Sequence, residues 1–330
     1  MPSFNNKRIN FKTAKKSMFE KPNTKNMNFF EKVTNEIETF AVDLLEPTGL
    51  IDGMEEDFND KINDYLAILD HKKTLPSNLT NKDIRNELKD IVKKYDENDG
   101  YMNISKEKIN EIKRKLFIFS GKGFKYYGVN EVEIGDGSKA KTIECDSYIA
   151  DDGNIYFCQT GGLITLNNMR MVAATMRRVK KDIPDHDNGK LDTIVISYSD
   201  HPNNSKNKHI VGEATEDLQK ISLYDVRVSK HNKVKRTIYH EVAHIVDQKY
   251  KKSDSKEWKE ACEKDHKWSS NYAYRSFKKL KHQYSEDYAE SVANLKMMGS
   301  EKYQKKYPNR YKILEKQYPY LCYEGENHGE

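Results

Sequence analysis

The amino-acid sequence predicts an α+β fold, because helical periodicity both precedes and follows a central stretch that is rich in strand signals. Apolar residues recur every three or four positions over residues 27–95 and again from residue 233 onward. Between residues 141 and 226, short β-branched and aromatic segments are separated by turn signals. We therefore expect an N-terminal helical module, followed by a larger domain in which a small sheet packs with helices.

The first part of the chain, residues 1–26, is strongly basic and has no apolar rhythm. It contains seven lysines and arginines against one acid, Glu20, with asparagine and serine between them. Such a segment cannot bury enough apolar surface to order itself, so we expect a disordered arm. The arm is either a solvated tail or an electrostatic tether to an anionic partner.

Residues 27–100 are predicted to form a helical module. Its three amphipathic helices are expected over residues 27–44, 54–69 and 80–95. Thr80 and Asp83 have the spacing of a capping box at the start of the third helix. No set of catalytic residues occurs here, so the module is expected to serve docking, folding support or self-association. The polar segment 96–103 predicts a domain boundary, with the second domain over residues 104–330.

The second domain is expected to alternate helices and strands before it becomes helical. A turn at Asp151, Asp152 and Gly153 predicts a hairpin. The expected elements are a helix over 105–116, hairpin strands over 141–150 and 154–161, a helix over 165–181, and strands over 193–199, 209–215 and 220–226. Further helices are predicted over 253–268 and within 301–321, where tyrosines and leucines would close the core.

Composition excludes some classes of protein. Of the 330 residues, 36% are hydrophobic and 33% are charged, which predicts a small core under a highly charged surface. The net charge of +5 is slight for this length, so binding to nucleic acid is not indicated. No apolar run approaches the roughly 20 residues that span a bilayer, so we expect no membrane span.

The N-terminus and the cysteines bear on where the protein works. No hydrophobic segment follows the basic N-terminal residues, so we expect no secretory signal peptide. The protein would then act in the cytoplasm of its producer or be delivered by a route that does not use such a signal. The four cysteines follow no metal-ligand spacing and are too scattered for a disulfide framework, so we expect reduced thiols.

The most informative stretch is residues 233–250, KVKRTIYHEVAHIVDQKY, which contains His240, Glu241 and His244 in the order His-Glu-x-x-His. On a helix the two histidines lie about one turn apart and about 40° around the axis, so both imidazoles can reach one ion. The alternative is an exposed helix with two incidental histidines. Apolar residues at helical spacing predict a buried opposite face, formed by Val234, Ile238, Val242, Ile245 and Val246.

A third metal ligand is predicted on a later helix. A catalytic zinc takes three protein ligands and leaves one position for water, so the two histidines need another donor. Glu286, in the segment YSEDYAESVANL, is the candidate. Glu290 lies one turn further on and could accept a hydrogen bond from a ligating histidine. The alternative is an ordinary helix whose first turn is stabilised by acidic residues.

The sequence HEVAHIVD followed by SEDYAES resembles the catalytic-domain family of anthrax lethal factor, a group of gluzincin metallopeptidases that includes the Pro-Pro endopeptidases. The resemblance covers roughly residue 105 to the C-terminus. It implies a zincin-like metallopeptidase domain, in which a small mixed sheet packs with the His-Glu-x-x-His helix and the glutamate helix. One departure is Asp287, which stands where the family has an aromatic residue.

The resemblance also implies roles for individual residues. One zinc ion per chain would be held by His240, His244 and Glu286, with Glu241 as general base. Glu290 would support the ligands, and Asp247 falls on an aspartate of the family motif with a supporting role.

A tyrosine that binds the developing oxyanion is implied as well, but its position in the family is occupied here by Lys279. The segment SSNYAYRS resembles the local context of that tyrosine and lies further upstream. Tyr272 is the first candidate, and Tyr274 and Tyr284 are the alternatives. An edge strand within 210–214 would lie along the substrate groove by the same analogy, although it is equally an ordinary hairpin strand.

These features predict a zinc-dependent endopeptidase that hydrolyses a protein or peptide substrate. The absence of a signal peptide together with the basic arm suggests a toxin-like effector. The alternative is a non-catalytic structural or adaptor protein that retains the scaffold, with the arm and the helical module binding a partner.

Overall fold

The computed structural model describes residues 50–97, 104–119, 123–135, 137–161, 163–186, 192–205, 210–215, 219–226, 230–279 and 283–322, with side chains from residue 58 onward. The predicted basic arm, the first predicted helix and the boundary segment 98–103 lie outside the described residues.

The chain divides into two compact units, Met1–Asp64 and Tyr65–Glu330. Helix α3 (Leu50–Leu69) begins in the first unit and ends in the second. The helix expected over 80–95 is α4 (Asn81–Glu97), and it packs against the first strand of the sheet. It therefore belongs to the same unit as the sheet, rather than to a separate N-terminal module.

The second unit contains a six-stranded mixed sheet with the order β1-β2-β3-β4-β6-β5. Its strands are β1 (Phe124–Ile134), β2 (Lys141–Ala150), β3 (Ile155–Gln159), β4 (Thr193–Ile196), β5 (Gly212–Thr215) and β6 (Lys220–Leu223). The predicted hairpin is confirmed as β2 and β3, which pair antiparallel. Strands β3, β4 and β6 are parallel, and β5 returns antiparallel to β6 at the edge of the sheet.

The sequence analysis missed β1. This strand pairs antiparallel with β2 along ten positions, but its register shifts between Tyr126 and Gly128. Burial still alternates along β1, with the even-numbered positions the more buried. Gly128 lies on the buried face whereas Tyr127 and Val129 lie on the other, so the sequence itself shows no clear alternation of apolar and polar residues. Gly128 has φ +110° at this point, a conformation that favours glycine.

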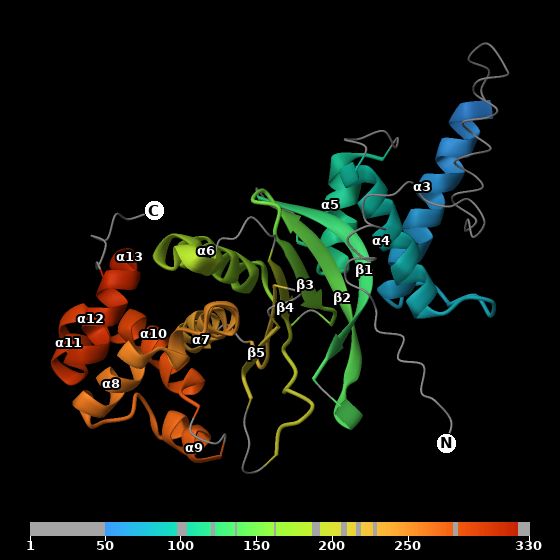
Figure 1. The fold of residues 1–330 in the computed structure, drawn as a ribbon. Coiled ribbons are helices and arrows are strands. Elements are labelled where there is room, and N and C mark those ends of the chain that lie inside the picture. The colour runs from blue at the N-terminus through green and yellow to red at the C-terminus, as the bar shows by residue number, and fades with distance from the viewer. Residues whose placement is uncertain are drawn as a thin grey trace. The chain divides into compact units, whose positions relative to one another are not determined.

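Helices cover both sides of the sheet (Figure 1). On one side lie α4 and α5 (Lys106–Lys115), and on the other α6 (Leu166–Asp182) and α7 (His231–Tyr250). The remaining helices follow α7 in sequence and are α8 (Lys256–Asp265), α9 (Asn271–Lys279), α10 (Ser285–Met298), α11 (Ser300–Lys306), α12 (Pro308–Gln317) and α13 (Pro319–Cys322). Helix α7 contacts β5, β6, α6 and α10, so it lies between the sheet and the C-terminal helices.

Local signals in the sequence explain where α4 begins and how it docks. The predicted capping box is confirmed, because the backbone N–H of Thr80 donates to Asp83 at 2.8 Å and that of Asp83 donates to the Thr80 hydroxyl at 3.2 Å. Further along the helix, Lys89 forms a buried ion pair with Asp146 of β2 at 2.9 Å. The charge on each group is thus compensated inside the unit.

A buried polar cluster fixes α7 against its neighbouring helices. The hydroxyl of Tyr239 donates to Asp182 of α6 at 2.6 Å, and the ammonium of Lys296 from α10 reaches the same carboxylate at 2.7 Å. Tyr239 and Asp182 are fully buried. Because Tyr239 directly precedes the first predicted ligand, this cluster sets the rotation of α7 about its axis.

In the part of the chain that the structure describes, no helix is both long enough and apolar enough to cross a bilayer. The four cysteines are free, as predicted, and all four are buried. Burial raises the pKa of the Cys145 thiol to about 12 and that of Cys322 to about 11, so neither is a reactive thiolate near neutral pH.

Candidate metal centre

Helix α7 presents one face to the core and its two histidines to the side on which α10 packs. The predicted core residues are confirmed, since Val234, Ile238, Val242, Ile245 and Val246 are all buried. The side chains of His240 and His244 are 13% and 16% exposed. Both rings therefore lie at the boundary between the core and solvent, where an ion could reach them.

The structure brings Glu286 to these two histidines. The Nε2 atoms of His240 and His244 lie 3.1 Å apart. The Oε2 atom of Glu286 lies 3.4 Å from the first nitrogen and 3.3 Å from the second. These three atoms form a nearly equilateral triangle, although Glu286 follows His244 by 42 residues in sequence.

The size of this triangle tests whether a zinc ion fits. Tetrahedral zinc with bonds of about 2.0–2.1 Å to nitrogen and oxygen places its ligand atoms about 3.3–3.4 Å apart. The separations of 3.1, 3.3 and 3.4 Å agree with that value. Two imidazole nitrogens facing each other at this distance also lack complementary charge unless a cation or a proton lies between them. The donor set therefore fits a divalent cation.

Electrostatics at the site favour positive charge. Burial alone would lower the pKa of His240, but hydrogen bonds with Glu286 and Glu290 raise it to about 10. Burial would likewise raise the pKa of Glu286, yet its hydrogen bonds with His240 and His244 hold it well below the usual range. The same field that holds a proton on the ring would stabilise a cation among the three ligand atoms.

Glu290 contacts Nδ1, the ring nitrogen of His240 that is not a candidate ligand atom. Its Oε1 atom lies 3.2 Å from Nδ1 of His240, and its Oε2 atom accepts a hydrogen bond of 2.8 Å from Arg236. Burial would raise the pKa of Glu290, but the hydrogen bond with His240 and the charge of Arg236 hold it at about 2. The ionised carboxylate thus fixes the tautomer that leaves Nε2 of His240 free to ligate. The sequence analysis proposed Glu290 but did not find Arg236.

Glu241 lies between the two histidines in sequence and points toward β5. It is 6% exposed, and burial raises the pKa of its carboxyl group while the nearby histidines lower it. A Cβ atom placed on Gly212 of β5 would lie 2.7 Å from the Glu241 Oε1 atom and would also meet Thr237. Only glycine fits there, so the edge strand approaches this carboxylate as closely as a backbone can.

Of the three candidate tyrosines, the structure brings Tyr272 to the site. Its hydroxyl donates to Oε1 of Glu286 at 3.1 Å, and its ring centroid lies 6.5 Å from that of His240. Tyr274 and Tyr284 instead pack against Trp268, each with ring centroids 5.8 Å apart. Tyr272 is 54% exposed and is carried by α9, which contacts α10.

Asp247 does not contact the ligand rings. Its carboxylate accepts hydrogen bonds from the backbone N–H and the hydroxyl of Ser253 at 2.6 and 2.7 Å. These bonds fix the turn that follows α7, so the supporting role of Asp247 is to end the helix rather than to orient a histidine. The resemblance did not predict these contacts between Asp247 and Ser253.

A buried network next to Glu286 was not predicted from the sequence. Asp287 accepts hydrogen bonds from the guanidinium of Arg310 at 2.9 and 3.2 Å, and from the hydroxyl of Ser269 at 2.8 Å. Arg310 also donates to Asp265 at 3.2 Å. The signal available in the sequence was Asp287 itself, a charge at a position where the resemblance predicts an aromatic side chain.

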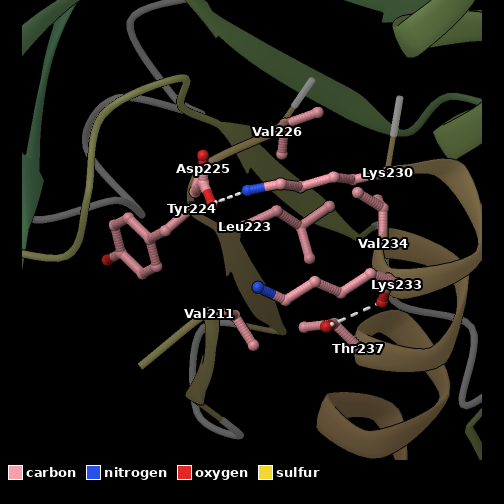
Figure 2. A pocket seen from close by; sticks show the side chains of 9 residues that line it. All are labelled: Val211, Leu223, Tyr224, Asp225, Val226, Lys230, Lys233, Val234 and Thr237. Atoms are coloured by element: carbon pink, nitrogen blue, oxygen red, sulfur yellow. Dashed lines mark hydrogen bonds and ion pairs between the residues drawn. The ribbon is translucent and has the colours of Figure 1, made fainter. Parts of the chain in front are cut away.

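A small pocket lies along α7, one turn before Glu241 (Figure 2). It is a small hollow, partly open to solvent, with space for about one water molecule. Its walls come from the start of α7, the end of β6 and the residue before β5. The lining residues are Val211, Leu223, Tyr224, Asp225, Val226, Lys230, Lys233, Val234 and Thr237. Thr237 belongs both to this pocket and to the contact with Gly212, so the pocket begins beside the candidate centre.

No family model, curated protein or solved structure matches this chain. The chemistry of the centre must therefore be inferred from its own atoms. They offer two imidazole nitrogens and a carboxylate oxygen as ligands, a buried carboxylate as a base, and an exposed phenol as a hydrogen-bond donor.

Proposed function

We propose that this protein is a zinc-dependent endopeptidase with a zincin-like catalytic domain, similar to the gluzincin family of anthrax lethal factor. The observation that carries the proposal is the triangle of ligand atoms from His240, His244 and Glu286, which has the size of a tetrahedral zinc site. The mixed sheet, with β5 at its edge beside α7, is compatible with that fold.

Three protein ligands are typical of catalytic zinc rather than structural zinc, because they leave a position for water or substrate. When bound at such a site, zinc polarises a substrate carbonyl and makes water acidic enough to lose a proton near neutral pH. His240, His244 and Glu286 would hold the ion. Glu290 and Arg236 would keep the His240 ring in the ligating tautomer.

Glu241 and Tyr272 would handle the proton and the developing charge. The carboxylate of Glu241 would accept a proton from the attacking water and pass it to the nitrogen of the leaving amine. Burial raises the pKa of Glu241, which makes it a stronger base than an exposed glutamate. The Tyr272 hydroxyl, now directed at Glu286, would donate a hydrogen bond to the substrate oxygen as negative charge develops there.

The open edge of β5 supports an extended peptide as substrate. The backbone N–H of Tyr224 donates to Val211 at 3.0 Å, so in this antiparallel pair the alternate residues Gly212 and Ala214 direct their N–H and C=O groups away from β6. No described strand pairs with β5 on that side. A peptide could add there as a further strand and lie across Glu241.

The amide of Asn204 limits how far such a peptide could pair. Its Oδ1 accepts from the backbone N–H of Ile210 at 2.6 Å, and its Nδ2 donates to the carbonyl of Ile210 at 3.2 Å. The side chain thus occupies the position that another peptide unit would take. Pairing with β5 would begin at Gly212, next to the candidate base.

Zinc content and peptide cleavage test the proposal together. The wild-type chain should hold about one zinc per molecule and cleave bonds in an unbiased peptide library. The Glu241→Gln variant should keep the zinc and lose about 10²- to 10⁴-fold in rate, the usual contribution of a general base. Glu260→Gln, which changes an exposed glutamate of α8, is the matched control. A wild-type chain that holds zinc and cuts nothing beyond what Glu241→Gln cuts would disprove the proposal.

A further inference from the structure

The pocket at the start of α7 contains two lysines with different surroundings (Figure 2). Lys230 forms an ion pair with Asp225, so its charge is neutralised within the pocket. Lys233 extends from α7 across the pocket toward β5, and no carboxylate among the described residues lies within ion-pairing distance of its ammonium. Among the described residues that line the pocket, Lys233 therefore carries the positive charge that no carboxylate compensates.

The walls around that charge are apolar. Leu223, Val226 and Val234 are buried, with exposed fractions of 1%, 0% and 5%. An ammonium beside such walls is less screened than one in open water, so it attracts an anion more strongly. The hollow is small and partly open to solvent, so a slender side chain could reach the ammonium from outside, whereas an aromatic ring would find no room. Together these properties fit a side chain that is apolar along its stem and negative at its tip.

The position of the pocket relates it to the reacting bond. Thr237, which lines the pocket, lies one helical turn before Glu241, and both meet the space over Gly212. Val211, on the opposite wall, directly precedes Gly212, where the open edge of β5 begins. A peptide paired with Gly212 would therefore carry its side chains past the mouth of this pocket while its backbone crosses the candidate base.

We propose that this pocket is a side-chain subsite and that Lys233 determines its specificity, so that substrates with aspartate or glutamate within two residues of the cleaved bond are preferred. The inference rests on the proposed endopeptidase function. Lys233 would not act on the reacting atoms. It would bind the substrate carboxylate, while Lys230 stays paired with Asp225 and keeps the pocket wall neutral.

Cleavage-site profiling with the full-length, zinc-loaded chain tests the inference. Wild-type cuts should be enriched in acidic residues at one position near the bond. Lys233→Met should reduce the preference for a glutamate peptide over its glutamine counterpart by roughly two- to fivefold, the size expected of one solvent-exposed ion pair. Lys233→Glu should prefer lysine or arginine at that position. Lys249→Met removes the same charge from the exposed far end of α7 and should behave as wild type.

Lys233 is exposed, so these variants should fold, and zinc content with circular dichroism verifies this. Wild-type cleavage without an acidic preference, or a preference that survives in Lys233→Glu, would overturn the subsite and leave the proposed function intact. A wild-type chain that binds zinc and cleaves no peptide would overturn both.

Discussion

Two adjacent carboxylates on α10 have opposite surroundings. Asp287 is 1% exposed and is fully compensated, because a guanidinium and a hydroxyl donate to its oxygens. Glu286 lies beside two imidazoles whose nitrogens point at its oxygen and at each other. A carboxylate whose partners already neutralise it holds the fold together. A carboxylate that converges with other electron-pair donors is arranged to bind a cation. Substitutions at Glu286 are therefore expected to affect metal binding, and substitutions in the Asp287 network to affect stability.

The largest effect is expected from changing Glu286, the proposed third ligand. Glu286→Ala should lose stoichiometric zinc and all measurable cleavage, since two histidines alone leave the donor set incomplete. The fold should survive, because Glu286 contributes no contact to the buried core network. Zinc content after dialysis, together with circular dichroism, measures both. Retention of a full equivalent of zinc by this variant would show that Glu286 is not a ligand and would remove the contrast with Asp287.

The next largest effect is expected on the cleavage rate, and it distinguishes Tyr272, which contacts Glu286, from Tyr274, which packs on Trp268. Tyr272→Phe should lower the rate by about 10²- to 10³-fold with zinc retained, as the loss of one oxyanion donor usually does. Tyr274→Phe is the matched control on the same helix, because Tyr274 packs on Trp268 and has no described contact with the ligands. If the two variants had equal activity, Tyr272 would be a surface residue of α9 with no role in catalysis.

Features that depend on residues close together in sequence could be predicted, whereas features that depend on the packing of distant segments were harder to predict. The spacing of His240 and His244 is fixed within one turn of one helix, so the sequence suffices to predict that both reach one point. The convergence of Glu286 depends on the docking of α10 on α7, which the sequence alone does not specify. It could be proposed only from the need for a third ligand and from the resemblance.

Other features depend on long-range pairing or on interrupted patterns, and these were missed. Strand β1 was missed because Gly128 lies on its buried face and Tyr127 and Val129 on the other, which obscures the apolar alternation in the sequence. Arg310 was missed because a hydrophobic pattern cannot predict a buried guanidinium, whose partners Asp265 and Asp287 lie 45 and 23 residues away. Tyrosines and leucines of the same terminal segment were correctly predicted to close the core, since Tyr303, Tyr307, Leu314 and Tyr318 are buried.

Changing the network around Asp287, whose charge is compensated, is expected to alter stability. Arg310→Met should reduce the free energy of unfolding by about 3–5 kcal/mol, because it leaves Asp265 and Asp287 as buried charges without their countercharge. Chemical denaturation measures the loss. Ser269, which Asp287 also binds, precedes α9, so loosening this network should also reduce cleavage through Tyr272. A variant as stable as wild type would mean that the network contributes nothing net.

The smallest effect is expected at Glu290, whose surroundings combine features of those of Glu286 and Asp287. This residue orients His240 through Nδ1 and is itself neutralised by Arg236, so it belongs to both the centre and its support. Glu290→Gln should weaken zinc binding by about 10- to 100-fold, the usual effect of losing a group that orients a ligating histidine. Competition with a zinc chelator measures it. Arg236→Met should weaken zinc binding less, because Arg236 is 36% exposed and water can take over part of its role. If Arg236→Met had the larger effect, the charge on Glu290 rather than its hydrogen bond would be the property that supports the ligand.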